Sequence, residues 1–421
     1  MAAHLVCLTN EGGVPLFSRS SGSAKPLAFA EQGMLYGVQM FAQNHGVTLQ
    51  TTDTEESKVV WRVFHDSIVL VLVQGDDGSS HVHANTLLEH VFQTMVMYLG
   101  LDTISRLRNI ERLRRDLRVC YPVIDSLLED VHVFDSICET VEVVSTTEVA
   151  SLQEPLESFV TECDSTFGCV HCNGRLLVAT PKWWSLSGQE MMLLCRFIRS
   201  LPKNSASDIP VYLPHASPKV PHRLISVHLL SGLVVSVLCL DVPTLSTVQS
   251  KLIETHWLPH FETLKGCLRA SVTNIPKTIP IDPGILGFLV INTEQHKCIS
   301  SCELPIVEGS MAERRPLTVQ KRRRILTSFY RNTVGSIFSV IHSPERKDPS
   351  GDRPSTFLHA AEETYMNALD HKCFAINSKD FRLFAIFSSA VPHHAVRYVS
   401  LQFLENLKKD KAFTDLREKK S

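Results

Sequence analysis

The sequence predicts an α+β protein of three tandem units, each a five-stranded antiparallel sheet flanked by helices. Three observations lead to this prediction. Short apolar runs separated by turn residues are typical of hairpin strands. Longer segments repeat apolar residues every three or four positions, as amphipathic helices do. The order of two strands, one helix, three strands and further helices occurs twice and returns less regularly a third time.

Length and composition limit the classes of protein to which the chain can belong. Its 421 residues suffice for two or three domains, and 44% hydrophobic residues can fill several cores. Lys and Arg number 42 against 44 Asp and Glu, so no basic excess predicts nucleic-acid binding. The 12 cysteines are scattered through apolar segments, and the first residues do not resemble a secretory leader. Both features indicate reduced thiols and a cytoplasmic location.

The first unit is expected over residues 1–133. It opens with a hairpin whose second strand contains Pro15, and this strand should lie at a sheet edge because proline cannot donate to the ladder. A helix follows with Met34, Leu35, Val38 and Phe41 on one face. The remaining expected elements are a third strand at 47–51, two central strands at 59–66 and 67–73, a helix at 87–99 and an arginine-rich helix at 104–117.

Residues 134–154 show little periodicity and are interpreted as a connector to a second unit over 155–270. Asn173-Gly174 between two apolar runs is a strong hairpin signal. The uncharged run 224–240 has 17 residues, too few to span a membrane, and Ser231-Gly232 divides it into two strand lengths. This run is therefore predicted to be a buried hairpin. The expected helices contain residues 152–160, 191–201 and 245–268, the last interrupted at Pro259.

The third unit, over residues 271–421, is the least regular of the three. A hairpin is expected at 286–291 and 297–301, followed by a helix through 325–337. A polar loop near 342–356 is expected to be mobile. Two strands at 373–376 and 381–387 and a final helix through 396–407 complete the unit.

No motif in the chain predicts a catalytic residue, a cofactor or a metal site. The phosphate-binding loop, the dinucleotide fingerprint and the nucleophile elbow are absent from the sequence. Cys169 and Cys172 lie three apart in an expected strand, so their side chains should point to opposite faces. The pairs His81/His83 and His393/His394 have no further ligand at matching spacing. A catalytic triad from distant residues stays open, but nothing in the spacing favours one.

Two basic clusters raise the question of an anionic partner. Six arginines lie between Arg106 and Arg118, but Glu111 and Asp116 supply intrahelical partners, which favours a solvated helix face. For the second cluster, a lipid or acidic-partner contact and a solvated face are about equally supported. One functional hypothesis is therefore a peripheral membrane-trafficking protein that binds anionic phosphoinositides. The second cluster consists of Lys321, Arg322, Arg323 and Arg324.

The order of elements resembles the longin fold. Three such units in one chain resemble the subunits of the Mon/Ccz class, whose heterodimers act as exchange factors for Rab GTPases. In more detail, the chain resembles the Fuzzy family of planar cell polarity effectors. The segments that carry this resemblance are 13–19, 64–68, 108–113 with 116–118, Trp183-Trp184, 211–215 and 220–224. They cover the first two units, and the third is matched mainly by position and length.

This resemblance implies a non-enzymatic scaffold of the CPLANE complex, which can serve as a non-catalytic subunit of an exchange factor. The implied partners are an Inturned-like longin protein in a heterodimer, a WD-repeat planar cell polarity effector and a Rab-like small GTPase, with no nucleic acid. The implied processes are ciliogenesis, planar cell polarity, intraflagellar and vesicle transport and Hedgehog signalling, in the cytoplasm, at the cytoskeleton and ciliary basal body.

The resemblance also implies where a partner would bind. In related longin pairs, the first units meet through the first helix and the neighbouring edge strand. Carried to matching positions, this implies a partner-binding surface that contains Met34, Leu35, Val38, Phe41, Val47 and Leu49.

Overall fold

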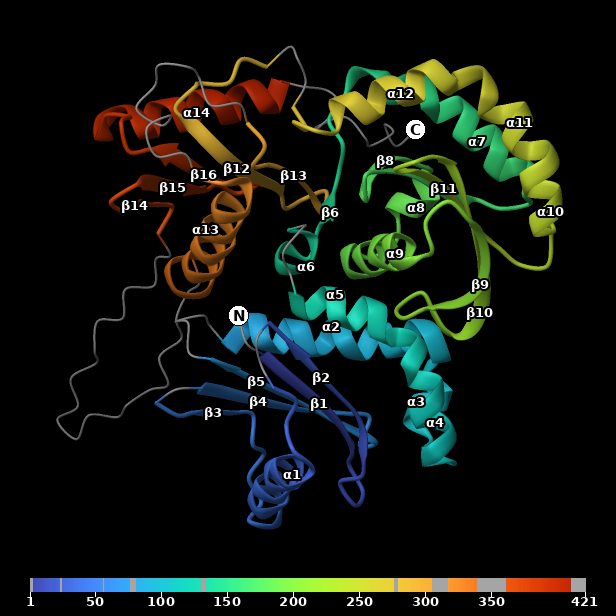
Figure 1. The fold of residues 1–421 in the computed structure, drawn as a ribbon, viewed down its shortest axis with the longest axis vertical. Coiled ribbons are helices and arrows are strands. Elements are labelled where there is room, and N and C mark those ends of the chain that lie inside the picture. Colours follow the sequence, from blue (N-terminus) through green and yellow to red (C-terminus); the bar gives the residue numbers. More distant parts are fainter. Residues whose placement is uncertain are drawn as a thin grey trace.

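In the computed structural model, two five-stranded sheets and one six-stranded sheet follow one another along the chain (Figure 1). The structure describes residues 3–22, 25–55, 57–75, 81–129, 134–275, 279–304, 317–338 and 361–409. Within these ranges, helices flank every sheet, as the sequence predicts. The loop expected to be mobile near 342–356 lies outside the described residues.

The first sheet has the order β2-β1-β5-β4-β3, and all its neighbouring strands are antiparallel. Pro15 is the first residue of the edge strand β2, so the predicted edge position is confirmed. The expected third strand at 47–51 is wrong in position, because the ladder begins only at Thr51. The elements are β1 (Ala3–Thr9), β2 (Pro15–Ser21), α1 (Phe29–Asn44), β3 (Thr51–Asp53), β4 (Ser57–Phe64) and β5 (Ile68–Gly75).

The helices after β5 cover one face of the first sheet, and α1 covers the other. The expected single arginine-rich helix is broken into short pieces, because Asn109 starts a new helix by accepting a hydrogen bond from the Arg112 N–H at 2.9 Å. The helices after β5 are α2 (His81–Leu99), α3 (Leu101–Ser105), α4 (Ile110–Asp116), the 3₁₀ turn η1 (Leu117–Cys120) and α5 (Tyr121–Glu129).

The second sheet repeats the same order as β8-β7-β11-β10-β9. The predicted buried hairpin at 224–240 is confirmed as β10 and β11, and no helix in the described ranges is long and apolar enough to cross a bilayer. The elements are α7 (Gln153–Glu162), β7 (Phe167–Cys172), β8 (Arg175–Ala179), α8 (Pro181–Trp184), α9 (Gly188–Ser200), β9 (Ala206–Leu213), β10 (Ser217–Leu230), β11 (Leu233–Cys239), α10 (Leu245–Thr247), η3 (Val248–Leu252), α11 (Ile253–His256), η4 (Leu258–His260) and α12 (Phe261–Ala270).

The third sheet has the order β14-β15-β16-β12-β13-β6. The predicted hairpin, the two later strands and the final helix are confirmed, whereas β14 was not foreseen. The elements are β12 (Ile285–Asn292), β13 (Lys297–Ser301), α13 (Val319–Asn332), η5 (Thr333–Ile337), β14 (Glu363–Asn367), β15 (His371–Asn377), β16 (Phe381–Ser388) and α14 (His393–Lys409).

The segment expected to be a featureless connector joins two sheets. It contains α6 (Asp135–Cys138), β6 (Val141–Glu142) and the 3₁₀ turn η2 (Thr147–Leu152). Strand β6 pairs in parallel with β13, and the next residue, Val143, bridges Leu176 of β8. The Val144 N–H donates to the Leu176 carbonyl at 2.9 Å. The connector therefore lies between the second and third sheets and is bonded to both (Figure 1).

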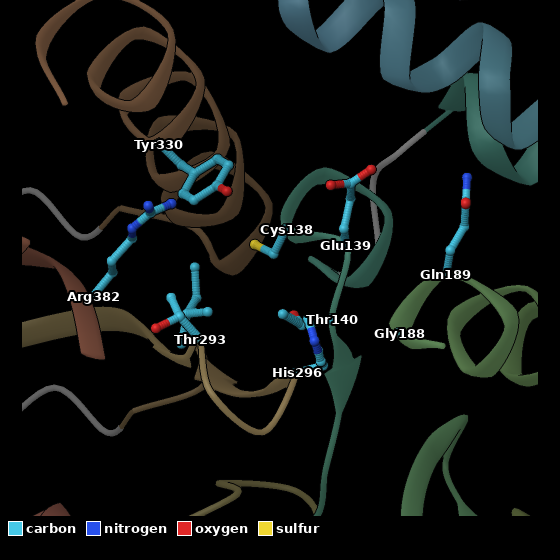
Figure 2. A pocket seen from close by; sticks show the side chains of 10 residues that line it. Cys138, Glu139, Thr140, Gly188, Gln189, Thr293, His296, Tyr330 and Arg382 are labelled. Atoms are coloured by element: carbon cyan, nitrogen blue, oxygen red, sulfur yellow. The ribbon is translucent and has the colours of Figure 1, made fainter. Parts of the chain in front are cut away.

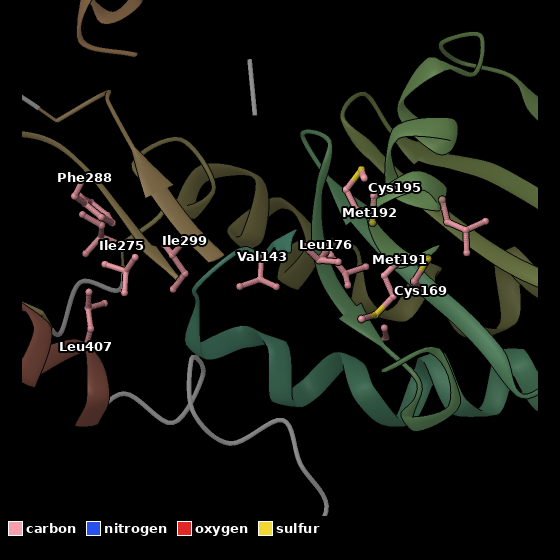
Figure 3. Close-up of a cluster of buried hydrophobic side chains, with 14 of the residues drawn as sticks. Val143, Cys169, Leu176, Met191, Met192, Cys195, Ile275, Phe288, Ile299 and Leu407 are labelled. Atoms are coloured by element: carbon pink, nitrogen blue, oxygen red, sulfur yellow. The ribbon is translucent and has the colours of Figure 1, made fainter. Parts of the chain in front are cut away.

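One apolar core runs beneath this junction. It includes Ile299 and Phe288 of the third sheet, Val143 of the connector, and Leu176 and Met191 of the second unit. Figure 3 shows these side chains in a continuous row from one sheet to the other. Because this core is shared, the second and third units are packed as one body.

The first unit packs onto the other two through the helices on one side of its sheet. The rings of Tyr98 in α2 and Phe197 in α9 lie 4.9 Å apart. Nη1 of the buried Arg196 donates to the Ser126 carbonyl of α5 at 2.7 Å. Helix α2 is thus buried on several faces, whereas α1 lies on the outer side of the first sheet, away from the other units (Figure 1).

Candidate partner-binding surfaces

Helix α1 is fixed to the first sheet by one face. The Glu31 carboxylate closes its first turn by accepting a hydrogen bond from the Ala28 N–H at 2.6 Å. Leu35 and Tyr36 pack on the apolar patch of the sheet that contains Trp61. Trp61 Nε1 donates to the Leu35 carbonyl at 3.3 Å, and the Tyr36 hydroxyl donates to the Asn10 carbonyl at 2.8 Å. These contacts set the rotation of the helix about its axis.

With this rotation fixed, α1 presents apolar side chains to the surface. Met34 is 64% exposed, Val38 51% and Phe41 68%. They lie at positions i, i+4 and i+7 and therefore share one face. Phe29 is also exposed, at 77%, but it lies five residues before Met34 and is therefore turned about 140° away from this face. We call Met34, Val38 and Phe41 the α1 outer face.

The structure separates the six residues of the expected partner-binding surface. Met34, Val38, Phe41 and Val47 are exposed. Leu35 and Leu49 are half-buried and pack against the chain's own sheet. The α1 outer face therefore contains three of the six expected residues, Met34, Val38 and Phe41.

The strand next to α1 forms a short open edge. All three residues of β3 are exposed, and within the described residues β3 pairs with β4 alone. Val47 and Leu49 precede this strand and do not belong to it. A free strand edge offers N–H and C=O groups to another chain. Helix α1 and β3 therefore place an apolar face and a short edge on the outer side of the first unit.

The basic cluster at the start of α13 does not form one surface, which corrects the expectation for Arg322. Only 3% of Arg322 is exposed, and its guanidinium donates to the carbonyls of Leu317, Leu286, Cys302 and Leu304. Burial of this guanidinium lowers its pKa. Arg322 is therefore occupied inside the third unit and is not available to a lipid.

The three other basic residues of this cluster differ in their surroundings. Lys321 Nζ lies 2.6 Å from the Asp370 carboxylate. The Arg323 side chain is 16% exposed and lies 3.9 Å from Glu303. Arg324 is exposed. The positive charge available at this helix start is thus smaller than four adjacent basic residues suggest.

A polar pocket of about 340 Å³ lies where the connector meets the second and third units. Figure 2 shows Tyr330 and Arg382 on one side of it and Glu139 and Gln189 on the other. The His90 imidazole of α2, 3.7 Å from Glu139, lowers the pKa of that carboxyl. Burial holds the pKa of Tyr330 well above its usual range. Opposite charges line this pocket, so it favours neither an anion nor a cation.

Cys169, Cys172 and the two histidine pairs each contact different parts of the structure. Cys169 and Cys172 pack in different cores on opposite faces of the second sheet, as predicted. His83 Nε2 lies 3.2 Å from the Arg331 carbonyl, and the His393 ring packs on Tyr365. Over the described part of the chain, no three His, Cys, Asp or Glu side chains are grouped as metal ligands.

Comparison with known proteins accounts for all three units. Three family models match in chain order, described as the first, second and third Longin domain of FUZ, MON1 and HPS1. They cover residues 3–127, 163–258 and 284–411.

Full-length relatives agree with these matches. The chain is 39% identical to the protein fuzzy homolog of Xenopus tropicalis, with 97% of this chain and 98% of that protein covered. It is 35% identical to the human protein fuzzy homolog over 95% of this chain and 90% of that protein. The mouse protein fuzzy homolog is 34% identical, with 96% of this chain and 97% of that protein covered. Both the domain order and these full-length matches show that the chain belongs to the Fuzzy family of proteins with three longin domains.

Proposed function

We propose that this chain is a non-enzymatic scaffold subunit that pairs with an Inturned-like longin protein through the α1 outer face and the β3 edge. Membership in the Fuzzy family supports the scaffold role itself. The resulting heterodimer belongs to a CPLANE-type complex, which also contains a WD-repeat planar cell polarity effector. It binds or activates a Rab-like small GTPase in ciliogenesis, planar cell polarity, intraflagellar and vesicle transport, and Hedgehog signalling.

The exposure of the α1 outer face is the observation that carries this proposal. An isolated apolar side chain on a surface needs no explanation, but several on one helix face indicate an interaction site. Met34, Val38 and Phe41 each have more than half of their surface exposed. The other face of the same helix is already used by the chain's own sheet. Burial of the outer face by a partner would remove apolar surface from water.

The proposed role needs surfaces and no nucleophile. An exchange factor releases nucleotide by repositioning the switch loops of a GTPase, so binding geometry alone suffices. In this proposal, the chain acts in the cytoplasm, at the cytoskeleton and the ciliary basal body. Direct phosphoinositide binding through α13 has less support, because Arg322 is buried and Lys321 is paired with Asp370.

The double variant Met34→Asp/Phe41→Asp tests the pairing. Both side chains are exposed, so we expect its melting temperature to stay close to that of the unmodified chain. Two carboxylates in an apolar interface should weaken capture of the Inturned-like partner by at least about tenfold. The measurement is a quantitative pull-down with purified full-length chains, together with thermal unfolding.

Gln43→Asp is the matched control, because Gln43 is exposed on the same helix and is not part of the α1 outer face. It adds the same kind of charge and should leave capture unchanged. Unchanged capture by the double variant would refute the proposed surface.

A further inference from the structure

A second pocket, of about 400 Å³, lies in the second unit at the end of the sheet where two hairpins turn. Its floor is a row across three neighbouring strands. Val234 of β11 is directly opposite His171 of β7 on one side and His228 of β10 on the other. Side chains of directly paired residues point to the same face of a sheet, so both imidazoles flank Val234 on one face. The partner-binding surface of the previous section is on another unit.

The walls of this pocket come from α9 and from the turns. Ile198, Arg199 and Leu201 line it at the end of α9, and Lys203 follows in the next loop. Gly174 in the β7–β8 turn has a φ of +77°, and a Cβ there would lie 2.7 Å from Arg199 Nε. Arg199 Nη2 donates to the Gly174 carbonyl at 2.7 Å. The turn is therefore shaped to fit closely against the guanidinium.

The charge of the lining has one sign. Arg199 and Lys203 are cationic, and no carboxylate is among the residues that line the pocket. The remaining polar groups are the two histidines, Asn173, Asn204 and Ser231. Three aliphatic side chains, Ile198, Leu201 and Val234, provide an apolar part. Such a lining suits a ligand with an anionic group and a small organic body.

His171 is the residue that indicates a ligand rather than a solvated loop. Its side chain is 2% exposed, and Nε2 is buried without a hydrogen-bond partner in the described residues. Nδ1 lies 3.7 Å from the Cys169 sulfur, so that nitrogen faces the adjacent side chain. His228 Nδ1 is likewise buried without a partner there. Buried polar atoms are nearly always hydrogen-bonded, so two such nitrogens at one pocket need an explanation.

We propose that this pocket, which we call the His171 pocket, binds a phosphate monoester. The phosphate would lie between Arg199, Lys203 and the Nε2–H of His171, and the rest of the ligand would lie against Ile198, Leu201 and Val234. Neutral imidazole carries one N–H, so His171 can donate to the phosphate without being charged. Cations around a phosphate form charge-assisted hydrogen bonds, which are stronger than neutral ones.

Two sources provide this chemistry: a small phosphorylated metabolite or a lipid headgroup. Inorganic phosphate and glycerol phosphate are the soluble probes, measured by isothermal titration calorimetry on the full chain. Phosphatidylcholine vesicles with and without phosphatidylinositol monophosphate are the lipid probe, measured by flotation. Binding to the soluble probes alone assigns a metabolite, whereas binding to the phosphorylated vesicles as well assigns a headgroup.

Three variants locate the binding. Lys203 is exposed, so Lys203→Gln should fold normally and weaken phosphate binding about fivefold. His171→Gln should weaken it about tenfold. Lys182→Gln is the matched control, because Lys182 is an exposed lysine of the same unit that lies outside the lining of the His171 pocket. It should leave binding unchanged.

A direct readout separates the His171 pocket from any other basic surface. In nuclear magnetic resonance spectra, the His171 ring signals should move on addition of phosphate, whereas those of the exposed His394 should not. Absence of binding to every probe would overturn the proposal. Binding that both Lys203→Gln and His171→Gln leave intact, with a stationary His171 signal, would overturn it equally. Neither result depends on the α1 outer face.

Discussion

At the scale of single residues, the environment decides the role of a charged side chain, and a run of adjacent charges does not reveal it. Lys321, Arg322, Arg323 and Arg324 read as one basic cluster. In the fold, helical geometry points consecutive residues in different directions, so Arg322 faces the core and Arg324 the surface. The local signal that distinguishes them is helical spacing, because Leu326 and Phe329, four and seven residues after Arg322, place Arg322 on the apolar face of α13. Of the four carbonyls that Arg322 contacts, that of Leu317 is five residues away, whereas those of Leu286, Cys302 and Leu304 are distant in the sequence.

Replacement of Arg322 tests this structural role. Arg322→Met would leave buried carbonyl groups without their donor, and we expect the free energy of unfolding to fall by about 2–4 kcal/mol. Arg324→Met removes the same charge from an exposed position and should change it by less than about 0.5 kcal/mol. Chemical denaturation of both variants is the measurement. Equal effects of the two substitutions would contradict the assignment.

His171 should make stability depend on pH. Burial, and then the charge of Arg199, lowers the pKa of His171 to about 3 from 6.5. Below pH 6.5 the unfolded chain therefore binds a proton that the folded chain does not bind until about pH 3. The unfolded state gains from this proton, so stability falls as the pH falls through that window.

The prediction for His171 concerns the slope of this loss. Between pH 6 and pH 4 the residue should contribute a loss of about 1.4 kcal/mol per pH unit, and His171→Gln should lack this part. His394→Gln, at an exposed position, should keep the slope of the unmodified chain. Chemical denaturation at a series of pH values measures the slope for the unmodified chain and for both variants. Identical slopes for His171→Gln and the unmodified chain would show that His171 titrates normally.

At the scale of elements, the sequence predicts well those helices and strands that have a local signal. The hairpin at Asn173-Gly174, the edge position of β2 and the division of 224–240 into two strands follow from turn residues, proline and length. β3 was placed too early, because apolar Val47 and Leu49 suggest a strand, whereas Leu49 packs on the sheet without joining its ladder. The apolar pattern of a segment thus indicates burial better than backbone pairing.

Glycines in two elements should respond oppositely to substitution. Gly37 lies in α1, and a Cβ there would meet nothing within 4 Å, so Gly37→Ala should raise the free energy of unfolding by about 0.5–1 kcal/mol. Gly174 has a positive φ and lies against Arg199, so Gly174→Ala should lower it by about 1–2 kcal/mol. Chemical denaturation again provides the values. A change of the same sign in both variants would contradict the described backbone conformations.

At the scale of the whole molecule, the least predictable feature is β6. It has two residues, pairs in parallel and leaves no periodic signal in the sequence. Its position depends on groups that are distant in the chain: Arg175 Nε lies 2.8 Å from Glu142, and the Ser300 hydroxyl donates to Glu142 at 2.6 Å. One buried carboxylate of the connector is therefore bonded to both the second and the third unit. Such contacts exist only once both sheets are folded.

Asn274 completes this junction, and its removal should loosen it. The buried side chain accepts from the Ser145 N–H at 3.1 Å and donates to the Val143 carbonyl at 3.0 Å. Its φ is 54°, a conformation that glycine also adopts, so Asn274→Gly removes the amide without added backbone strain. We expect the free energy of unfolding to fall by about 2–3 kcal/mol, because the Ser145 N–H and the Val143 carbonyl lose their partner.

Hydrogen exchange distinguishes a loosened junction from a general loss of stability. In Asn274→Gly, the amides of Val141, Val143 and Val144, which hold β6 between the two sheets, should exchange faster. Strand β5 belongs to the sheet of the first unit, so its amides should exchange at their original rate. Uniformly faster exchange would mean that the three units unfold together. Unchanged exchange at β6 would mean that Asn274 does not hold the connector, and that the shared core alone joins the second and third units.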